Sequence, residues 1–448
     1  MIPTNLFLNL NLDVILLALP FLTILFCWIY LLANSFRSNY MLKATLDKKA
    51  LVNDNNYNSE NVFPYVSVIV PARNEHENIE RCLISLMEQN YPNFEIIAVD
   101  DNSTDDTLIK MKKIQQKYKH HNHQKQKNYP TLKIIELKDK PIDWTGKTWA
   151  SEQGYLESKN DILLFVDADT YFEKNCIHRA ISYMLKEELD VLTGYPFTEL
   201  RDFWSKITIP IWKLMSITFG KNASNVNNPK SKIAFLMGCF FIIKRNVFEK
   251  IGTFRIVRNA IQEDALLGIK IKQSGYKLRM IPMDNLVNAL WTRDLSTLWH
   301  GIGRTLAPMI LNQERKVIIN FFTIFFMTAL PFLILLASLL LTGFYHHHHQ
   351  ELFITDKNNN CNNYCGILIL NLIIFIIVIF NTALESKKTF KISPLYALLC
   401  PIGSLLLIIA HLSCLVPLSL PISRNLSKKI IKWKERLYVY KRIGGSMT

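Results

Sequence analysis

The chain has 448 residues, of which 49% are hydrophobic, and it carries a formal net charge of +15. At roughly 150 residues per domain, this length allows a large buried core. The hydrophobic fraction excludes a disordered chain. A mean hydropathy of +0.11 beside so high a charge means that apolar and charged residues are segregated along the sequence.

Four long stretches contain no Asp, Glu, Lys or Arg. They are Val14 to Ala33, Val317 to Phe344, Gly366 to Leu384 and Pro394 to Leu420. Each approaches or exceeds the ~20 apolar residues that a helix needs to cross a bilayer. The pattern predicts an integral membrane protein. It excludes an entirely soluble enzyme, a collagen-like fibre and a disulfide-stapled secreted module.

The charged residues lie mainly between the first two apolar stretches, in a segment long enough for one sizeable α/β domain. We therefore predict four regions in chain order. They are an N-terminal transmembrane anchor (1–34), a globular domain (35–316), a membrane region of about three apolar segments (317–420) and a basic tail (421–448).

Short β-branched runs alternate with helical patterns in the first half of the globular region, and this alternation predicts a mostly parallel sheet with helices on its faces. A polar stretch from His120 to Pro130 predicts an exposed loop. The expected strands are Val66 to Val70, Glu95 to Val99, Leu132 to Leu137 and Ile162 to Val166, and the expected helices are Glu77 to Gln89, Asp105 to Tyr118 and Thr148 to Ser158.

An aromatic-rich stretch from Phe203 to Phe219 follows, interrupted by Pro210. Two interpretations remain open. Apolar residues at helical spacing usually form core, but a segment rich in tryptophan can also lie at the membrane surface.

Acidic residues follow three of the expected strands: Glu75 after the first, Asp100 and Asp101 after the second, and Asp167 and Asp169 after the fourth. In an open parallel sheet, ligands bind beyond the carboxyl ends of the strands. Two carboxylates at such a turn can approach one hard cation that also bridges phosphate oxygens.

Lys147, in the segment Trp144-Thr145-Gly146-Lys147, could meet a phosphate, although an ordinary surface lysine is the competing interpretation. Together with the strand-end acids, it makes a nucleotide-diphosphate site credible.

With these motifs in view, the sequence resembles the family 2 glycosyltransferases, which are inverting nucleotide-sugar enzymes with a GT-A fold. The resemblance rests on VSVIVPARNEHENIERCLISLMEQNYPNFEIIAVDDNSTDDT, WTGKTWASEQG, LLFVDADT, MGCFFIIKR and QEDALLGIKIKQSGY, which occur in the family's order. The WTGK segment, the apolar spans and the tail segment WKERLY further resemble the hopene-associated and carotenoid glycosyltransferase branches.

This resemblance implies an α/β GT-A domain, Rossmann-like and mostly parallel, flanked by transmembrane helices. It implies that Asp169, aided by Asp167, holds Mn²⁺ or Mg²⁺, and that Asp264 is the general base. Glu263, one position away, is expected to point elsewhere. The residues that the resemblance assigns to donor binding are Pro71, Arg73, Glu75, Asp100, Asp101, Lys147 and Asp167.

One segment departs from the pattern of the family's processive polysaccharide synthases. Those enzymes carry Gln/Arg-x-x-Arg-Trp after the base, whereas this chain reads Trp299-His300-Gly301-Ile302-Gly303-Arg304-Thr305. Arg304 is still a candidate contact for the diphosphate, and Trp299 for the acceptor. The departure disfavours a polymer synthase.

The expected function is therefore the transfer of a sugar from a nucleotide-sugar donor, with a UDP-sugar expected, to a hydroxyl of a lipid or isoprenoid acceptor. The alternatives are a nucleotidyltransferase, a processive polysaccharide synthase and a catalytically inactive membrane scaffold. Nucleic-acid binding has little support, because membrane anchoring explains much of the basic excess.

Membrane orientation is inferred from the distribution of Lys and Arg. The excess of Lys and Arg around the globular domain predicts a multi-pass protein with a cytosolic catalytic domain. Four simple crossings would place the basic tail on the opposite side, where positive charge is disfavoured. We therefore expect one of the last apolar segments to be re-entrant or interfacial.

Overall fold

The computed structural model describes residues 18–33, 63–123, 129–218, 222–348, 360–419, 428–433 and 436–441. The chain forms two compact units. We call Ser38–Arg201, Gly220–Pro308 and Ser427–Thr448 the sheet unit, and Met1–Arg37, Asp202–Phe219 and Met309–Leu426 the helical unit.

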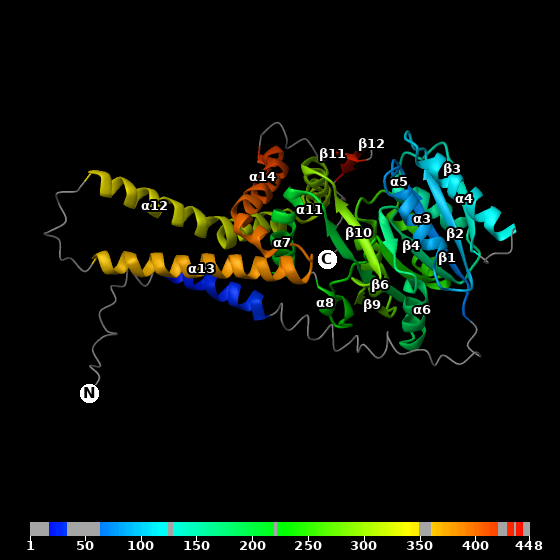
Figure 1. Cartoon of the computed structure of the whole chain (residues 1–448), viewed down its shortest axis with the longest axis horizontal. Coiled ribbons are helices and arrows are strands. Elements are labelled where there is room, and N and C mark those ends of the chain that lie inside the picture. The colour runs from blue at the N-terminus through cyan, green and yellow to red at the C-terminus, as the bar shows by residue number, and fades with distance from the viewer. Residues whose placement is uncertain are drawn as a thin grey trace. The chain divides into compact units, whose positions relative to one another are not determined.

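The sheet unit is built on a seven-stranded sheet of order β3-β2-β1-β4-β8-β6-β9. The first four strands in this order are parallel (Figure 1). Strand β8 runs antiparallel to both of its neighbours. The predicted α/β class is therefore confirmed. The strands are β1 (Val66–Ala72), β2 (Phe94–Asp101), β3 (Thr131–Leu137), β4 (Ile162–Val166), β6 (Val191–Tyr195), β8 (Phe240–Lys244) and β9 (Leu278–Pro282).

Alternate residues of β1 enter different hydrophobic clusters, as the two-residue period of a strand requires. Val66, Val68 and Val70 pack with residues of α3 and α6, whereas Ile69 packs with Tyr155 of α5. The sheet therefore has a helical layer on each face. The helices of this unit are α3 (Ile79–Met87), α4 (Thr107–His123), α5 (Gly146–Leu156), α6 (Cys176–Lys186), α8 (Ala223–Asn227), α9 (Arg245–Ile251) and α10 (Glu263–Gln273), with a 3₁₀ turn η1 (Phe254–Val257).

The predicted end of α4 was wrong. Helix α4 continues to His123 instead of ending at Tyr118, so the start of the expected polar loop is helical. Tyr118 is buried and stacks edge-on against Tyr129 with ring centroids 4.7 Å apart, which anchors this end of the helix to the core. The polar residues after Tyr118 give no indication of this packing in the sequence.

Two small sheets complete the unit. Strands β5 (Thr170–Phe172), β10 (Val287–Thr292) and β7 (Phe197–Leu200) form the first, in that order. The second is an antiparallel hairpin of β11 (Lys428–Trp433) and β12 (Arg436–Lys441).

The helical unit holds three helices that are long and apolar enough to cross a membrane, among the described residues: Arg315–Ser338, Leu368–Lys388 and Pro394–Leu415. A shorter apolar helix spans Ala18–Ala33. The elements are α7 (Phe203–Thr218), α11 (Leu295–Ile324), whose first half belongs to the sheet unit, a π-helical segment η2 (Phe325–Ala329), α12 (Leu330–His348), α13 (Asn360–Lys388), a 3₁₀ turn η3 (Pro394–Leu399) and α14 (Cys400–Ser419).

The aromatic-rich stretch forms α7, which packs against α13 and α14. Its residues Ile207, Ile211 and Leu214 are buried. A Cβ added to Gly403 of α14 would lie 2.1 Å from the backbone oxygen of Ile207, so only glycine permits this approach. Burial favours the core interpretation of α7, here within the helical unit.

Candidate active site

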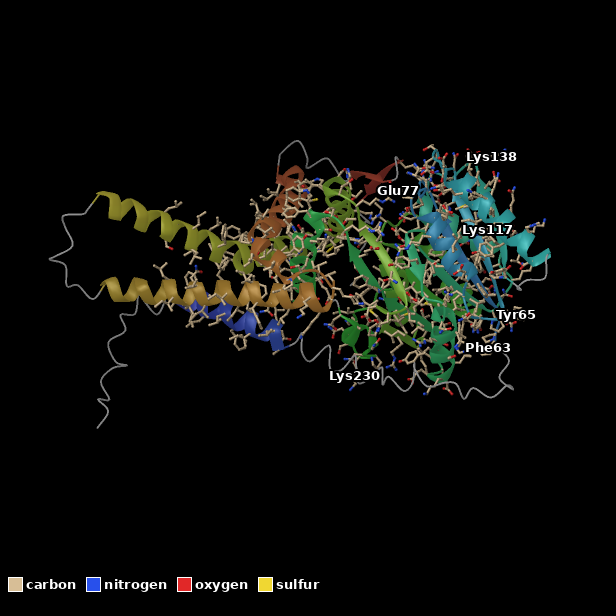
Figure 2. All side chains as sticks on the ribbon, viewed as in Figure 1. Phe63, Tyr65, Glu77, Lys117, Lys138 and Lys230 are labelled. Carbon is tan, nitrogen blue, oxygen red and sulfur yellow. The ribbon has the colours of Figure 1, made fainter. Side chains whose placement is uncertain are left out.

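The carboxyl ends of β1, β2 and β4 lie at one edge of the sheet because these strands are parallel neighbours. Figure 2 shows Phe63 and Tyr65, which precede or lie beside the amino end of β1, at the opposite end of the strands from Glu77 and Lys138, which follow β1 and β3. Ligands of open parallel sheets bind at the carboxyl edge.

Two asparagines shape the loops at this edge. Asn74, after β1, has φ 51°, and Asn102, after β2, has φ 54°, a left-handed conformation that asparagine tolerates better than most residues. Between the two loops, the backbone amide of Thr104 donates to Asn74 Oδ1 at 2.9 Å. Arg73 Nη1 donates to the carbonyls of Asp101 and Asn102, each at 2.6 Å. The loops therefore fix each other.

Asp100 and Asp101 are both 3% exposed. Asp100 Oδ2 accepts from the Ser103 amide at 3.1 Å, whereas its Oδ1 is buried without a hydrogen-bond partner among the described residues. Burial raises the pKa of Asp101, although Arg436 and Arg73 oppose the shift. A buried acceptor without a partner is costly, so a donor supplied by a ligand would be favoured there.

Glu75 has a partner that the sequence did not reveal. Its Oε2 accepts from Asn78 Nδ2 at 3.0 Å and lies 3.4 Å from Arg293 Nη2. Arg293 lies 218 residues away in the sequence, just beyond β10, so no local spacing could have indicated the contact.

Lys147 lies in the first turn of α5, which begins there because Thr145 caps the helix by accepting from the Thr148 amide. Lys147 Nζ lies 2.6 Å from Asp167 Oδ1 and 2.9 Å from Glu263 Oε1. Burial alone would lower the pKa of Lys147, but the surrounding carboxylates outweigh it and hold that pKa well above its usual value. Lys147 is therefore a fixed cation and not an ordinary surface lysine.

Asp264 lies beside this cation. Its Oδ2 accepts from the Gly238 amide at 3.2 Å, and its Oδ1 accepts from the Ala265 amide at 2.7 Å. A Cβ on Gly238 would lie 2.9 Å from Lys147 Nζ and 3.1 Å from Asp264 Oδ2, so glycine admits both groups. Burial raises the pKa of Asp264, and Lys147 opposes the rise.

The structure contradicts the expectation that the Glu263 side chain points elsewhere. Helix α10 begins at Glu263, and the buried carboxylate of Glu263 pairs with Lys147. The carboxylates of Glu263 and Asp264 therefore both lie close to one cation. Sequence reasoning missed this role, although the Gln262-Glu263-Asp264 motif contained the signal.

Asp167 and Asp169 follow β4, and their surroundings suit a hard divalent cation. The buried thiols of Cys82 and Cys239 have pKa values raised well above the usual range, first by burial and then by these and other carboxylates. Asp167 and Asp169 offer carboxylate oxygens, the donors that hard divalent cations prefer. No group of three or more ligating side chains occurs among the described residues. Two carboxylates completed by substrate phosphates are a usual setting for Mg²⁺.

Asp169 lines a small pocket with Arg81, Arg201 and Leu290. Trp299 and Arg304 lie on α11. Gln262 Nε2 donates to the Thr305 carbonyl at 3.2 Å, which brings α11 to the start of α10. The structure thus places α11 beside the start of α10, next to Asp264 in sequence.

Comparison with known proteins identifies the family. A model described as glycosyl transferase family 2 matches residues 67–252. A second, described as glycosyl transferase family group 2, matches residues 162–409, which is more than half of the chain. The chain belongs to the family group 2 glycosyltransferases. The predicted family and its GT-A-like core, with the mostly parallel sheet, are thereby confirmed.

Individual relatives of this glycosyltransferase are distant. It is 26% identical over 276 residues to the probable glycosyltransferase YdaM of Bacillus subtilis, covering 59% of this chain and 62% of that protein. It is 27% identical over 154 residues to 4,4'-diaponeurosporenoate glycosyltransferase of Staphylococcus aureus, covering 34% and 36%. The matched regions thus span less than two thirds of either relative.

Among solved structures, the mannosyltransferase PcManGT from Pyrobaculum calidifontis, in complex with GDP-Man and Mn²⁺, aligns with a TM-score of 0.42 and 17% identity. The alignment covers 87% of this chain and 98% of that one.

Proposed function

We propose that the protein is a membrane-bound inverting glycosyltransferase that moves a sugar from a nucleotide-sugar donor to a hydroxyl of a hydrophobic acceptor. The observation that carries this proposal is the convergence of Asp167, Glu263 and Asp264 on Lys147 beside the carboxyl edge of the sheet. A fixed cation among buried and half-buried acids suits a substrate with a diphosphate at one end and a proton to remove at the other.

The donor's nucleotide would lie over the ends of β1 and β2. Arg73 fixes the loop that carries Asp101, and the unpartnered Asp100 Oδ1 is available to a donor group of the base or ribose. Pro71 and Glu75 would line the same pocket. Lys147, at the N-terminus of α5, would face the diphosphate, where helix amides also favour anions.

Asp167 and Asp169 would hold Mn²⁺ or Mg²⁺ together with the diphosphate. The metal would supply Lewis-acid stabilisation of the departing nucleoside diphosphate. Lys147 adds a further positive charge on the same side, because it lies 2.6 Å from Asp167. Two sources of positive charge would thus stabilise the leaving group, whose negative charge grows in the transition state.

Asp264 would take the proton of the acceptor hydroxyl. At the same time the hydroxyl oxygen of the acceptor would bond to the anomeric carbon, and the bond from that carbon to the diphosphate would break. A single displacement of this kind inverts the configuration. Two backbone amides hold the Asp264 carboxylate, and burial raises its pKa, which makes it a better proton acceptor than an exposed aspartate.

The acceptor is proposed to be a lipid or isoprenoid. Three helices of the helical unit are long and apolar enough to hold the protein in a bilayer, where such acceptors are dissolved. The Staphylococcus aureus relative is named for 4,4'-diaponeurosporenoate, and this name supports the same class of acceptor. Trp299 and Arg304 of α11 are the candidate contacts on the acceptor side.

The test is turnover by the purified full-length protein, given UDP-glucose or GDP-mannose, a membrane lipid extract and Mn²⁺. We expect release of nucleoside diphosphate and a sugar-bearing lipid. Release of pyrophosphate would instead indicate a nucleotidyltransferase, and no turnover with any tested donor would contradict the proposal.

A further inference from the structure

The basic hairpin of β11 and β12 reaches the nucleotide end of the proposed site through one side chain. Arg436, the first residue of β12, donates from Nη1 to Asp101 Oδ2 in an ion pair. Its Nη2 also donates to the Asp101 carbonyl at 3.3 Å. These residues are 335 positions apart and both belong to the sheet unit.

The pair is enclosed. The side chain of Asp101 is 5% exposed and that of Arg436 is 19% exposed. Ion pairs on open protein surfaces contribute little to stability. When one partner of a shielded, hydrogen-bonded pair is removed, the other charge is left buried without a partner, which is costly. The contact is therefore more than an incidental surface attraction.

Arg436 also makes this end of the site cationic. Arg73 binds the same Asp101 carbonyl from the β1 side. Lys140 lies close enough that burial and then the charge of Arg436 lower its pKa, while Asp101 raises it. Three cations thus surround one carboxylate, which favours an anionic ligand such as a nucleoside diphosphate.

We propose that Arg436 is a donor-positioning residue, through which the C-terminal hairpin reaches the nucleotide pocket. The inference rests on the proposed function, since it assigns Asp101 to the donor. Arg436 holds the Asp101 carboxylate in place, and a guanidinium has five N–H donors, so further donors remain for carbonyl or hydroxyl oxygens of the nucleotide. Within the hairpin this role belongs to Arg436 alone, and it is separate from the membrane anchoring expected of the other basic residues.

The test uses the full-length protein in detergent with Mn²⁺ and titrates UDP and GDP by calorimetry. We expect Arg436→Ala to weaken binding of the preferred nucleotide at least ~10-fold, which corresponds to about 1.4 kcal/mol. Arg436→Lys should recover part of the loss, because it restores charge without the planar fork. Lys441→Ala, which removes one positive charge from the same strand, should bind like the parent.

Two further readouts separate positioning from a general loss of structure. The donor KM of Arg436→Ala should rise while kcat stays within ~3-fold, and added guanidinium ion should restore part of the nucleotide affinity. Combined with Asp101→Asn, Arg436→Ala should cause little additional loss, because residues that act together are not additive.

Unchanged binding by Arg436→Ala would overturn the proposal. Tighter binding by Arg436→Ala would also overturn it and would show that Arg436 competes with the donor. An equal loss of affinity in Lys441→Ala would show that Arg436 acts only through its positive charge. If the parent binds neither UDP nor GDP, the proposed function fails as well. If the parent binds and the Arg436 variant binds equally, only this inference fails.

Discussion

At the scale of single residues, Asp264 has two possible roles that its position alone does not separate. It lies in the first turn of α10, where any acid benefits from the helix N-terminus. Its carboxylate also lies beside Lys147 and accepts from the Gly238 amide of another segment. A helix cap serves folding, whereas a general base serves only the transfer step.

Asp264→Asn should therefore bind nucleotide normally yet transfer sugar at least ~100-fold more slowly, the usual contribution of a positioned base. Nucleotide titration and single-turnover transfer measure the two steps separately. Transfer close to the parental rate, or loss of both folding and binding, would exclude Asp264 as the base.

The pH dependence of transfer follows from the same carboxylate. A base acts only when ionised, so the rate should fall as pH decreases through the raised pKa of Asp264, above the ~3.9 of an exposed aspartate. Lys147 favours the ionised form, so Lys147→Met should move the acid limb of the kcat profile to higher pH. An acid limb that Lys147→Met leaves in place would contradict this coupling.

The strand-end acids could be predicted from sequence because a parallel sheet brings the ends of its neighbouring strands together, whatever their separation in the chain. Asp101 and Asp167 are examples. The contacts of Glu75 with Arg293 and of Asp101 with Arg436 could not be predicted, because they join segments 218 and 335 residues apart and no local period records such pairs.

At the scale of elements, α7 and α14 pack with backbone almost in contact at Gly403. An added Cβ would meet backbone atoms of Ile207, which cannot rotate away. Gly403→Ala should therefore destabilise the protein by about 1–3 kcal/mol, as overpacking does. Gly303→Ala on α11 is the matched control, since a Cβ there would meet nothing within 4 Å.

Thermal unfolding in detergent measures both glycine variants. The Gly403 variant should unfold at a lower temperature, whereas the Gly303 variant should be unchanged or slightly stabilised, because alanine favours helix. Equal midpoints for Gly403→Ala and the parent would show that the two helices pack less tightly than described.

An ion pair joins α7 to the end of α13. Lys213 Nζ lies 2.6 Å from Glu385 Oε1, and the Glu385 side chain is 6% exposed. Removing one partner leaves a buried charge, so Lys213→Met should destabilise the protein by about 3–5 kcal/mol, and the double variant with Glu385→Leu should recover much of the loss. A double-mutant cycle of unfolding midpoints checks this, and simple additivity would contradict it.

At the scale of the whole molecule, the contact of Arg436 with Asp101 bears on membrane topology. Both residues belong to the sheet unit, so we propose that they lie on the same side of a bilayer, with an even number of full crossings between them. Three helices of sufficient length lie between them in the described part of the chain. We infer that one of the three does not cross fully, as the basic tail led us to expect.

The corresponding prediction concerns Asp54, which lies outside the described residues, and Lys441 of β12. Cysteines placed at these two positions should be labelled from the same side, the cytosol, because positive charge is retained there. If a probe at Lys441 reacts only from outside, the topology with four simple crossings is correct and this prediction is wrong.

The central claim, sugar transfer to a membrane-dissolved acceptor by a base at Asp264, is tested most directly by the mass of lipids. Lipid extracts would be compared between cells producing the parental chain and cells producing Asp264→Asn at equal abundance. The proposed function predicts a lipid heavier by one sugar residue in the parental extract alone. Identical extracts, or the same product with both chains, would contradict it.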